Sequence, residues 1–437
     1  MGRTIIKDLK NEIGNEILIQ GWVDVRRDQG KMVFMDMRDM TGKVQSVILP
    51  KYESVLEKAK EVRNEWVLAV SGVVNKRPEK NVNEGVENGD IELEITRVEV
   101  LAEAKELPFD KEGELNLDTY LDHLPFTLRT EKARDIFKVQ ETIIQEFREA
   151  LKKENFTEFQ APAIVGGDAE GGAAAFKVDY YYDKSAFLAT SPQIYKQIMA
   201  GVYERVFTTP KIWRGEKHAT TRHLSELTQM DFEMAFIENH LDVMAVLEKV
   251  TKSMVAKVVE KHSDVLEKFE IEKPLVPEKF PILTLREAQK IIGAPEDPDL
   301  DPEGERQIWE WAKKEHGSDF VFITHFPTKK RAWYSYDDPE NSEYTLSFDL
   351  IFRGLEINSG SQRIHNYEYL VNKMKERGLE PKKFEFYLET FKYGMPPHGG
   401  CSTGLERMTA RMLGLSNVKE AALFPRDMNR IDIRLLD

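Results

Sequence analysis

The chain has 437 residues, which exceeds what one hydrophobic core usually serves, so two or three domains are expected. Its net charge is −14, and its single cysteine, Cys401, excludes an intramolecular disulfide and a thiolate-rich metal site, which leaves an oxygen-ligated cation such as magnesium. No run approaches the roughly 18 to 20 apolar residues of a membrane span, and the N-terminus lacks a signal peptide's apolar run, so we expect a cytoplasmic protein with no membrane partner.

Residues 1–100 show the pattern of a small β domain. Five apolar runs, with one helical segment before the fourth, follow one another in the order Ile17–Val25, Met32–Met37, Lys43–Leu49, Tyr52–Val62 (the helix), Trp66–Val74 and Ile91–Val100. This order is typical of an OB-fold barrel, and a generic β-sandwich is the alternative that the pattern leaves open. The segment holds 16 Lys and Arg against 18 Asp and Glu, so its charge neither supports nor excludes a nucleic acid partner.

In the rest of the chain the sequence pattern changes twice. Residues 106–130 are charged and broken by Pro108 and Pro125, which predicts a hinge. From residue 131 onward, long amphipathic helices alternate with apolar strands. Residues 274–340 are rich in Pro, Asp and Glu and are interpreted as an insertion on this core.

The segment Val206–Phe236 holds a cationic cluster. It reads as a strand ending in Arg214-Gly215-Glu216, a polar loop that carries Arg222-His223, and a second strand. A loop of this length favours an antiparallel hairpin, whose mouth would hold Arg214, Arg222 and His223 for forked contacts with phosphate. Gln229, Asp231 and Glu233 alternate and therefore share one strand face. A solvated, charged hairpin is the alternative.

Two later segments add polar groups to apolar surroundings. In Leu346–Arg363, Glu356 and Ser359 could hold a hard cation and Arg363 could pair with a carboxylate, although Gly/Ser loops ending in Arg are common. In Gly394–Arg407 the glycines allow close approach to a ligand. This segment matches neither a Walker A loop nor a GxGxxG turn, which disfavours both of those nucleotide sites.

Together these segments resemble the class II aminoacyl-tRNA synthetases, and among them the aspartyl group in its compact archaeal and eukaryotic-like form. Phe156–Ile164, centred on Pro162, resembles the first class II motif, Arg214–Glu216 with Arg222–Glu226 the second, and Gly404–Arg407 the third. The resemblance covers nearly the whole chain. It implies an α+β protein: an OB-fold anticodon-binding β-barrel at 1–105, a hinge at 106–130, and a class II catalytic domain at 131–437, built as an antiparallel sheet flanked by helices. It also implies a homodimer formed through the first motif.

The resemblance further implies an aspartate–tRNA ligase, which forms aspartyl-adenylate from aspartate and ATP and transfers the aspartyl group to tRNA(Asp), with tRNA(Asn) as a second possible substrate. It assigns catalysis to Arg214, Glu216 and Arg407. It assigns ATP binding to Arg214, Glu216, Arg222, His223, Leu224, Glu356, Gly404 and Arg407, and Mg²⁺ binding to Glu356 and Ser359. It assigns aspartate binding to Glu170, Gln193, Lys196, Asp231, Ser359 and Arg363, and anticodon contacts to Arg27, Phe34 and Gln45.

Several alternatives stay open. An asparaginyl-tRNA synthetase shares this architecture, although a neutral amide would leave Lys196 and Arg363 poorly paired. A tRNA-independent relative that amidates aspartate would generally lack the N-terminal domain, and a non-catalytic RNA-binding paralogue would not need the arginines of the motifs. Lys196 could be an exposed helix lysine and Phe34 a core residue. Leu227 departs from the phenylalanine that many relatives place against adenine.

Overall fold

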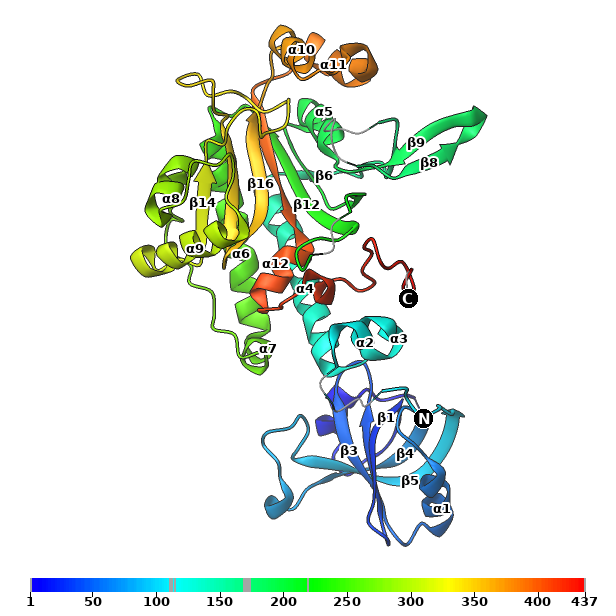
Figure 1. Ribbon diagram of the computed structural model, residues 1–437. Helices are drawn as coiled ribbons and strands as arrows, with labels where there is room; N and C mark the ends of the chain where they lie inside the picture. The colour runs from blue at the N-terminus through cyan, green and yellow to red at the C-terminus, as the bar shows by residue number, and fades with distance from the viewer. Residues whose placement is uncertain (1, 110–112, 114, 168–173, 218–219, 436–437) are drawn as a thin grey trace. The chain divides into compact units, whose positions relative to one another are not determined.

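A computed structural model describes residues 2–109, 113, 115–167, 174–217 and 220–435 (Figure 1). The chain divides into two compact units, Met1–Gly113 and Glu114–Asp437. The boundary falls inside the segment interpreted as a hinge, whose described residues include two short helices, α2 (Leu117–Asp122) and α3 (Leu124–Thr127). None of the helices in the described ranges is long and apolar enough to cross a membrane.

The first unit is a closed five-stranded barrel, which confirms the predicted OB-fold and shows that the sandwich alternative was wrong. Its strands pair in the order β1-β2-β3-β5-β4, with bounds β1 Glu16–Asp28, β2 Val33–Arg38, β3 Lys43–Ile48, β4 Val67–Lys76 and β5 Ile91–Ala102. Helix α1 (Glu53–Glu61) lies between β3 and β4 in the chain, as predicted. Alternate residues such as Val33, Met35 and Met37 fill the barrel, and this period of two explains why the strands were visible in the sequence.

The second unit is built on a nine-stranded, mainly antiparallel sheet, which confirms the predicted fold class. Its order is β13-β14-β15-β16-β17-β12-β10-β6, with β11 paired to β12. The bounds are β6 Thr157–Glu158, β10 Arg205–Thr208, β11 Lys211–Trp213, β12 Glu226–Ala235, β13 Ile282–Thr284, β14 Phe320–Thr324, β15 Ser347–Phe352, β16 Leu355–Arg363 and β17 His398–Gly404. Among the described pairs of this sheet, only β13/β14 and β10/β6 are parallel.

Long helices cover one face of this sheet. Helices α4 (Glu131–Lys153), α6 (His240–Lys261) and α12 (Leu405–Met412) share one hydrophobic core with β12, β14, β15 and β16. The buried stripe of α4 includes Ile136, Val139, Ile143 and Phe147, the spacing of an amphipathic helix that packs on a sheet. The other face of the central strands is thereby left for polar side chains.

Smaller elements surround the sheet edges. Helix α5 (Gln193–Tyr203) precedes β10, while α7 (Ser263–Lys268), α10 (Tyr367–Glu376) and α11 (Glu385–Lys392) complete the unit. Strands β7 (Ile164–Val165), β8 (Lys177–Tyr180) and β9 (Lys184–Leu188) form a separate small sheet, and Figure 1 shows the β8–β9 hairpin extending away from the body.

The interpretation of residues 274–340 as an insertion was wrong in one respect. This segment supplies β13 and β14 to the main sheet, and its helices α8 (Leu285–Ile292) and α9 (Pro302–His316) lie beside β14 (Figure 1). Leu285, Ile308, Val321 and Ile351 form a joint core that ties the helices to the sheet. The Pro-rich and acidic composition reflects exposed turns between these elements rather than a separate appendage.

Candidate active site

A cavity of about 350 Å³ lies over the polar face of the central strands. The predicted residues that line it are Gln193, Lys196, Arg214, Arg222, His223, Leu224, Asp231, Glu356, Ser359, Arg363, Gly404 and Arg407. Glu216 is not among the lining residues, although the neighbouring Gly215 amide donates to the Ala174 carbonyl oxygen at 2.7 Å. Glu170 lies outside the described residues. The cavity therefore joins the predicted ATP and amino-acid residues in one site.

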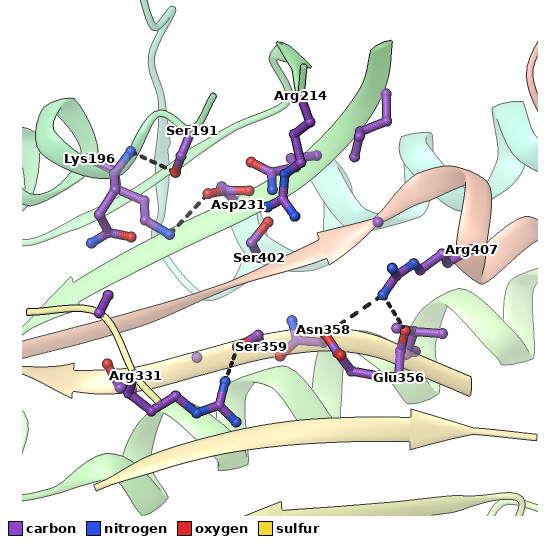
Figure 2. A pocket seen from close by; sticks show the side chains of 18 of the residues that line it. Ser191, Lys196, Arg214, Asp231, Arg331, Glu356, Asn358, Ser359, Ser402 and Arg407 are labelled. Carbon is purple, nitrogen blue, oxygen red and sulfur yellow. Dashed lines mark hydrogen bonds and ion pairs between the residues drawn. The ribbon is translucent and has the colours of Figure 1, made fainter. Parts of the chain in front are cut away.

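Strand pairing explains how residues so far apart in the sequence meet. Strand β17 lies between β12 and β16, so that Asp231 and Ser359 both have Ser402 as their cross-strand partner. Helix α12 begins directly after β17 and brings Arg407 to the cavity, where its Nη1 donates to the Glu356 carbonyl oxygen at 3.0 Å. Figure 2 shows Arg214 and Arg407 approaching the cavity from different elements. The two arginine segments are therefore parts of one site.

At one side of the cavity, two buried cations pair with two buried carboxylates. Lys196 is 1% exposed, so the exposed-lysine alternative was wrong, and its Nζ lies 2.9 Å from Asp231 Oδ2 and 3.5 Å from Glu233 Oε2. Arg363 Nε donates to Glu233 Oε1 at 2.9 Å. The Arg363 guanidinium holds the pKa of Glu233 below its usual range, against the opposing effect of burial. Glu233 therefore neutralises one of the two positive charges.

Backbone carbonyl groups also contact the two cations of this ion-pair cluster. Arg363 Nη2 donates to the Gly400 carbonyl oxygen at 2.9 Å, and Lys196 Nζ donates to the Cys401 carbonyl oxygen at 3.2 Å. A Cβ atom at Gly400 would lie 2.1 Å from Glu233 Oε2. Only glycine therefore leaves room for the carboxylate that neutralises Arg363.

Five buried polar atoms around this cluster have no hydrogen-bond partner within the described part of the chain. They are Gln193 Nε2, Gln229 Oε1, Asp231 Oδ1, Asn358 Oδ1 and Ser402 Oγ, and all five residues line the cavity. Buried polar atoms are normally paired, so their concentration at one place indicates a ligand that carries both donors and acceptors. The unpaired Asp231 oxygen is suited to an ammonium group.

Across β17 from Asp231, the site has oxygen atoms suited to a hard cation. Asp349 and Ser359 are cross-strand partners on β15 and β16, and Arg331 donates to both, at 2.6 Å to Asp349 Oδ2 and 3.0 Å to Ser359 Oγ (Figure 2 shows the bond to Ser359). Burial raises the pKa of Asp349 to about 7, and its Oδ1 has no partner among the described residues. With Glu356 these groups form an oxygen donor set that fits a divalent cation.

Two residues of this part of the site, Asp349 and Arg331, were not predicted from the sequence. Asp349 interrupts an apolar strand, and its alternation with Phe348 and Leu350 was a signal that it faces away from the core. Arg331 lies in a loop without periodicity, and no sequence pattern distinguishes it. The described residues contain no cluster of three or more His, Cys, Asp or Glu side chains that would hold a metal alone.

The three predicted anticodon residues lie together on the outside of the barrel. Arg27 is the cross-strand partner of Phe34, and its guanidinium donates to Asp36 at 2.8 and 2.9 Å and to Gln45 Oε1 at 3.5 Å. Phe34 is partly exposed while its neighbours Val33 and Met35 fill the core, so the core alternative for Phe34 was wrong. An aromatic ring, a guanidinium and an amide on one outer face are suited to unstacked bases.

Comparisons with known proteins agree with this geometry. The family model for class II tRNA synthetases (D, K and N) matches residues 116–428, and the model for the OB-fold nucleic acid binding domain matches residues 17–101. The chain belongs to the class II tRNA synthetases of the D, K and N group, which confirms the resemblance identified from the three motifs.

Individual relatives cover the whole chain. The Aspartate–tRNA(Asp/Asn) ligase of Thermus thermophilus is 42% identical over 98% of this chain and 99% of its own length. The Aspartate–tRNA(Asp) ligase of Pyrococcus furiosus is 38% identical over 96% of both chains. Among solved structures, asparaginyl-tRNA synthetase from Pyrococcus horikoshii complexed with asparaginyl-adenylate gives a TM-score of 0.91 at 31% identity and covers 99% of both chains.

Proposed function

We propose that this enzyme is an aspartate–tRNA ligase that uses ATP to form aspartyl-adenylate and then transfers the aspartyl group to the 3′ end of tRNA(Asp). The observation that carries the proposal is the cavity in which Lys196 and Arg363 adjoin Arg214 and Arg407. Full-length relatives named as aspartate–tRNA ligases support it.

Charge balance favours aspartate over asparagine. If the α-ammonium group of the substrate binds the unpaired oxygen of Asp231, the remaining charges are two cations, Lys196 and Arg363, and one anion, Glu233. The side-chain carboxylate of aspartate compensates the surplus positive charge. The amide of asparagine leaves a buried charge unpaired, which is costly in a site of low dielectric constant.

The reaction needs positioning and charge neutralisation rather than a general base. The α-carboxylate of aspartate attacks the α-phosphorus of ATP, a P–O bond forms, and pyrophosphate leaves with the electron pair of the broken bond. Arg214, Arg222 and Arg407 line the cavity and would stabilise the phosphate charge. In the second step, a terminal tRNA hydroxyl attacks the activated carbonyl carbon, and AMP leaves.

We also propose that Mg²⁺ binds at the oxygen donor set described above. Glu356 and Ser359, as implied by the resemblance, and Asp349, with its buried unpaired oxygen, would hold it. When bound, the cation would shield phosphate charge during attack. Arg331 already contacts Asp349 and Ser359, so this chain keeps a positive charge beside these ligands.

Recognition of tRNA is proposed for the barrel face that carries Arg27, Phe34 and Gln45. We propose tRNA(Asp) as the substrate, with tRNA(Asn) as a second one, since relatives carry both names. We further propose that the enzyme works in the cytoplasm as a homodimer joined through Phe156–Ile164. Strand β6 of that segment lies at the sheet edge, and Ile164 is 49% exposed, as expected for a surface that a partner covers.

Pyrophosphate exchange with aspartate or asparagine tests the amino acid, and charging of purified tRNA(Asp) and tRNA(Asn) side by side tests the tRNA. We expect exchange that depends on aspartate. Exchange with asparagine alone would make the enzyme an asparaginyl-tRNA synthetase. Ammonia-dependent formation of free asparagine would make it a tRNA-independent amidating relative.

A further inference from the structure

A carboxylate from outside the three motifs reaches the wall of the ATP site. Glu305 lies on α9, in the segment 274–340 that was interpreted as an insertion, and is 7% exposed. Its Oε2 accepts a hydrogen bond from the Arg222 guanidinium and another, at 2.8 Å, from the Glu356 backbone amide. One oxygen atom therefore links the loop of the second motif to the start of β16.

The helix that carries Glu305 is fixed in place. Its N-terminus is capped by Asp301, whose Oδ1 accepts from the Gly304 amide at 2.7 Å. Ile308 and Ala312 are fully buried in the core shared with β14 and β15. At the turn between β15 and β16, a Cβ atom on Gly354 would lie 3.0 Å from the Arg306 side chain, so the helix and the turn are in direct contact. The carboxylate of Glu305 is therefore held by rigid elements.

The charges around Glu305 explain why the carboxylate is needed there. Burial raises the pKa of Glu305, while Arg222 and the Glu356 amide act in the opposite direction. Burial also lowers the pKa of Arg411, and the nearby positive charge of Arg222 adds to that effect, whereas Glu305 opposes it. Without Glu305, two neighbouring guanidinium groups would lack the anion that lies between their charges. The Arg222 side chain is 20% exposed, so without this partner its guanidinium is free to turn toward solvent and away from the cavity wall.

We propose that Glu305 is a positioning residue for ATP: it holds the Arg222 guanidinium at the cavity wall in the orientation that receives the distal phosphates. Arg222 lines the cavity, its guanidinium carries five N–H donors, and the bond to Glu305 uses a donor of Nη2 only. An arginine already oriented loses less conformational entropy when the nucleotide arrives. The inference rests on the proposed function, because the contact of Arg222 with ATP is itself part of that proposal.

The first test compares Glu305→Gln with Glu303→Gln in pyrophosphate exchange. Glu303 lies two positions earlier on α9, is exposed, and pairs with Arg306 at the surface, so it is a matched control. Glu305→Gln keeps the size of the side chain and removes its charge. We expect the KM for ATP to rise about tenfold, which corresponds to a moderate coupling energy between contacting residues. The KM for aspartate should stay unchanged. Glu303→Gln should change neither.

The second test asks whether Glu305 acts through Arg222. We expect Arg222→Ala to raise the KM for ATP, and the double variant Arg222→Ala/Glu305→Gln to raise it no further. Glu305→Asp, which keeps the charge on a shorter side chain, should restore part of the ATP affinity. Thermal unfolding of each variant monitors the fold.

Three outcomes would overturn the inference. The first is a KM for ATP that is unchanged or lower in Glu305→Gln. A lower value would mean that Glu305 competes with the phosphates for Arg222. The second is an equal rise in the KM values for ATP and aspartate, which would indicate a structural role only. The third is an additive rise in the double variant. If Arg222→Ala itself leaves the KM for ATP unchanged, the proposed ATP site is wrong as well, so the two failures are distinguishable.

Discussion

Lys196 Nζ and Asp231 Oδ2 lie 2.9 Å apart in an ion pair whose two side chains are each 1% exposed. The pair joins α5 to β12, and the second oxygen of Asp231 has no partner among the described residues. A buried pair with one unused acceptor is suited to a ligand that brings its own cation. We therefore expect Lys196 and Asp231 to contact different groups of the substrate.

Lys196→Ala should raise the KM for aspartate by about 10- to 100-fold, the cost of losing a charge-assisted hydrogen bond. The KM for ATP should stay nearly constant, because the arginines proposed to bind phosphate are untouched. Aspartate-dependent pyrophosphate exchange measures both constants. Lys257→Ala on α6, which removes a partly exposed lysine paired with Glu260, is the control. An increase confined to ATP would contradict this prediction.

Arg214→Ala and Arg407→Ala should each reduce adenylate formation by about 10²- to 10³-fold, the loss typical of a donor that stabilises developing charge. The Arg214 side chain is exposed and that of Arg407 is 26% exposed, so neither change should unfold the protein. The measurement is pyrophosphate exchange, accompanied by thermal unfolding. Near-normal exchange in either variant would remove that arginine from the mechanism.

His398 should make the fold sensitive to acid. It is fully buried, the Gln197 side chain lies 2.8 Å from its Nε2, and burial lowers its pKa from 6.5 to about 4. Between these pH values the unfolded chain binds more protons than the folded one, so stability falls as the pH falls through this window. The contribution is on the order of 3 kcal/mol.

His398→Gln retains an acceptor for Gln197 but does not titrate. We therefore expect this variant to lose less stability than the wild type between about pH 6.5 and pH 4.5. Thermal unfolding at the two pH values measures the difference. His240, also buried with a pKa lowered to about 4, should keep part of the acid sensitivity in both proteins. Equal acid-induced losses in the two proteins would refute the role of His398.

Phe34→Ala should weaken tRNA binding without affecting adenylate formation. Loss of one stacked base costs about 1–3 kcal/mol, which corresponds to a rise of about 5- to 150-fold in the KM for tRNA. Arg27 and Gln45 remain on the same face to contribute hydrogen bonds. Charging kinetics with tRNA(Asp) give this constant, and tRNA-independent pyrophosphate exchange serves as the internal control. A normal KM for tRNA would remove Phe34 from the anticodon surface.

The sequence allowed the fold and much of the site to be predicted where local periodicity carried the information. Alternation placed the barrel strands, and it put Asp231 and Glu233 on one face of β12 before their partners were known. The ATP residues were assigned through the three motifs. The role of Glu305 was not predicted, because it depends on where α9 packs in the fold. The sequence of a helix does not show which distant arginine one of its acidic residues contacts.

Two other differences between the sequence predictions and the structure have the same origin. Glu216 was predicted in the site from its neighbours in the motif, yet Arg214 of the same motif lines the cavity and Glu216 does not. Arg331 lies in an irregular loop and reaches Asp349 and Ser359 only because β15 and β16 pair in this register. Contacts between segments distant in the sequence are set by sheet registry, which periodicity within one segment does not reveal.

The close contact between Gly400 and the Glu233 carboxylate limits how the specificity of this enzyme can evolve. A side chain at Gly400 would displace the anion that balances Arg363, so single substitutions of that glycine are expected to disturb the ion pairs beside the cavity. New specificity is instead expected to arise from α5, which presents Gln193 and Lys196 to the cavity. Descendants with altered substrates should therefore keep the glycine and differ along the helix.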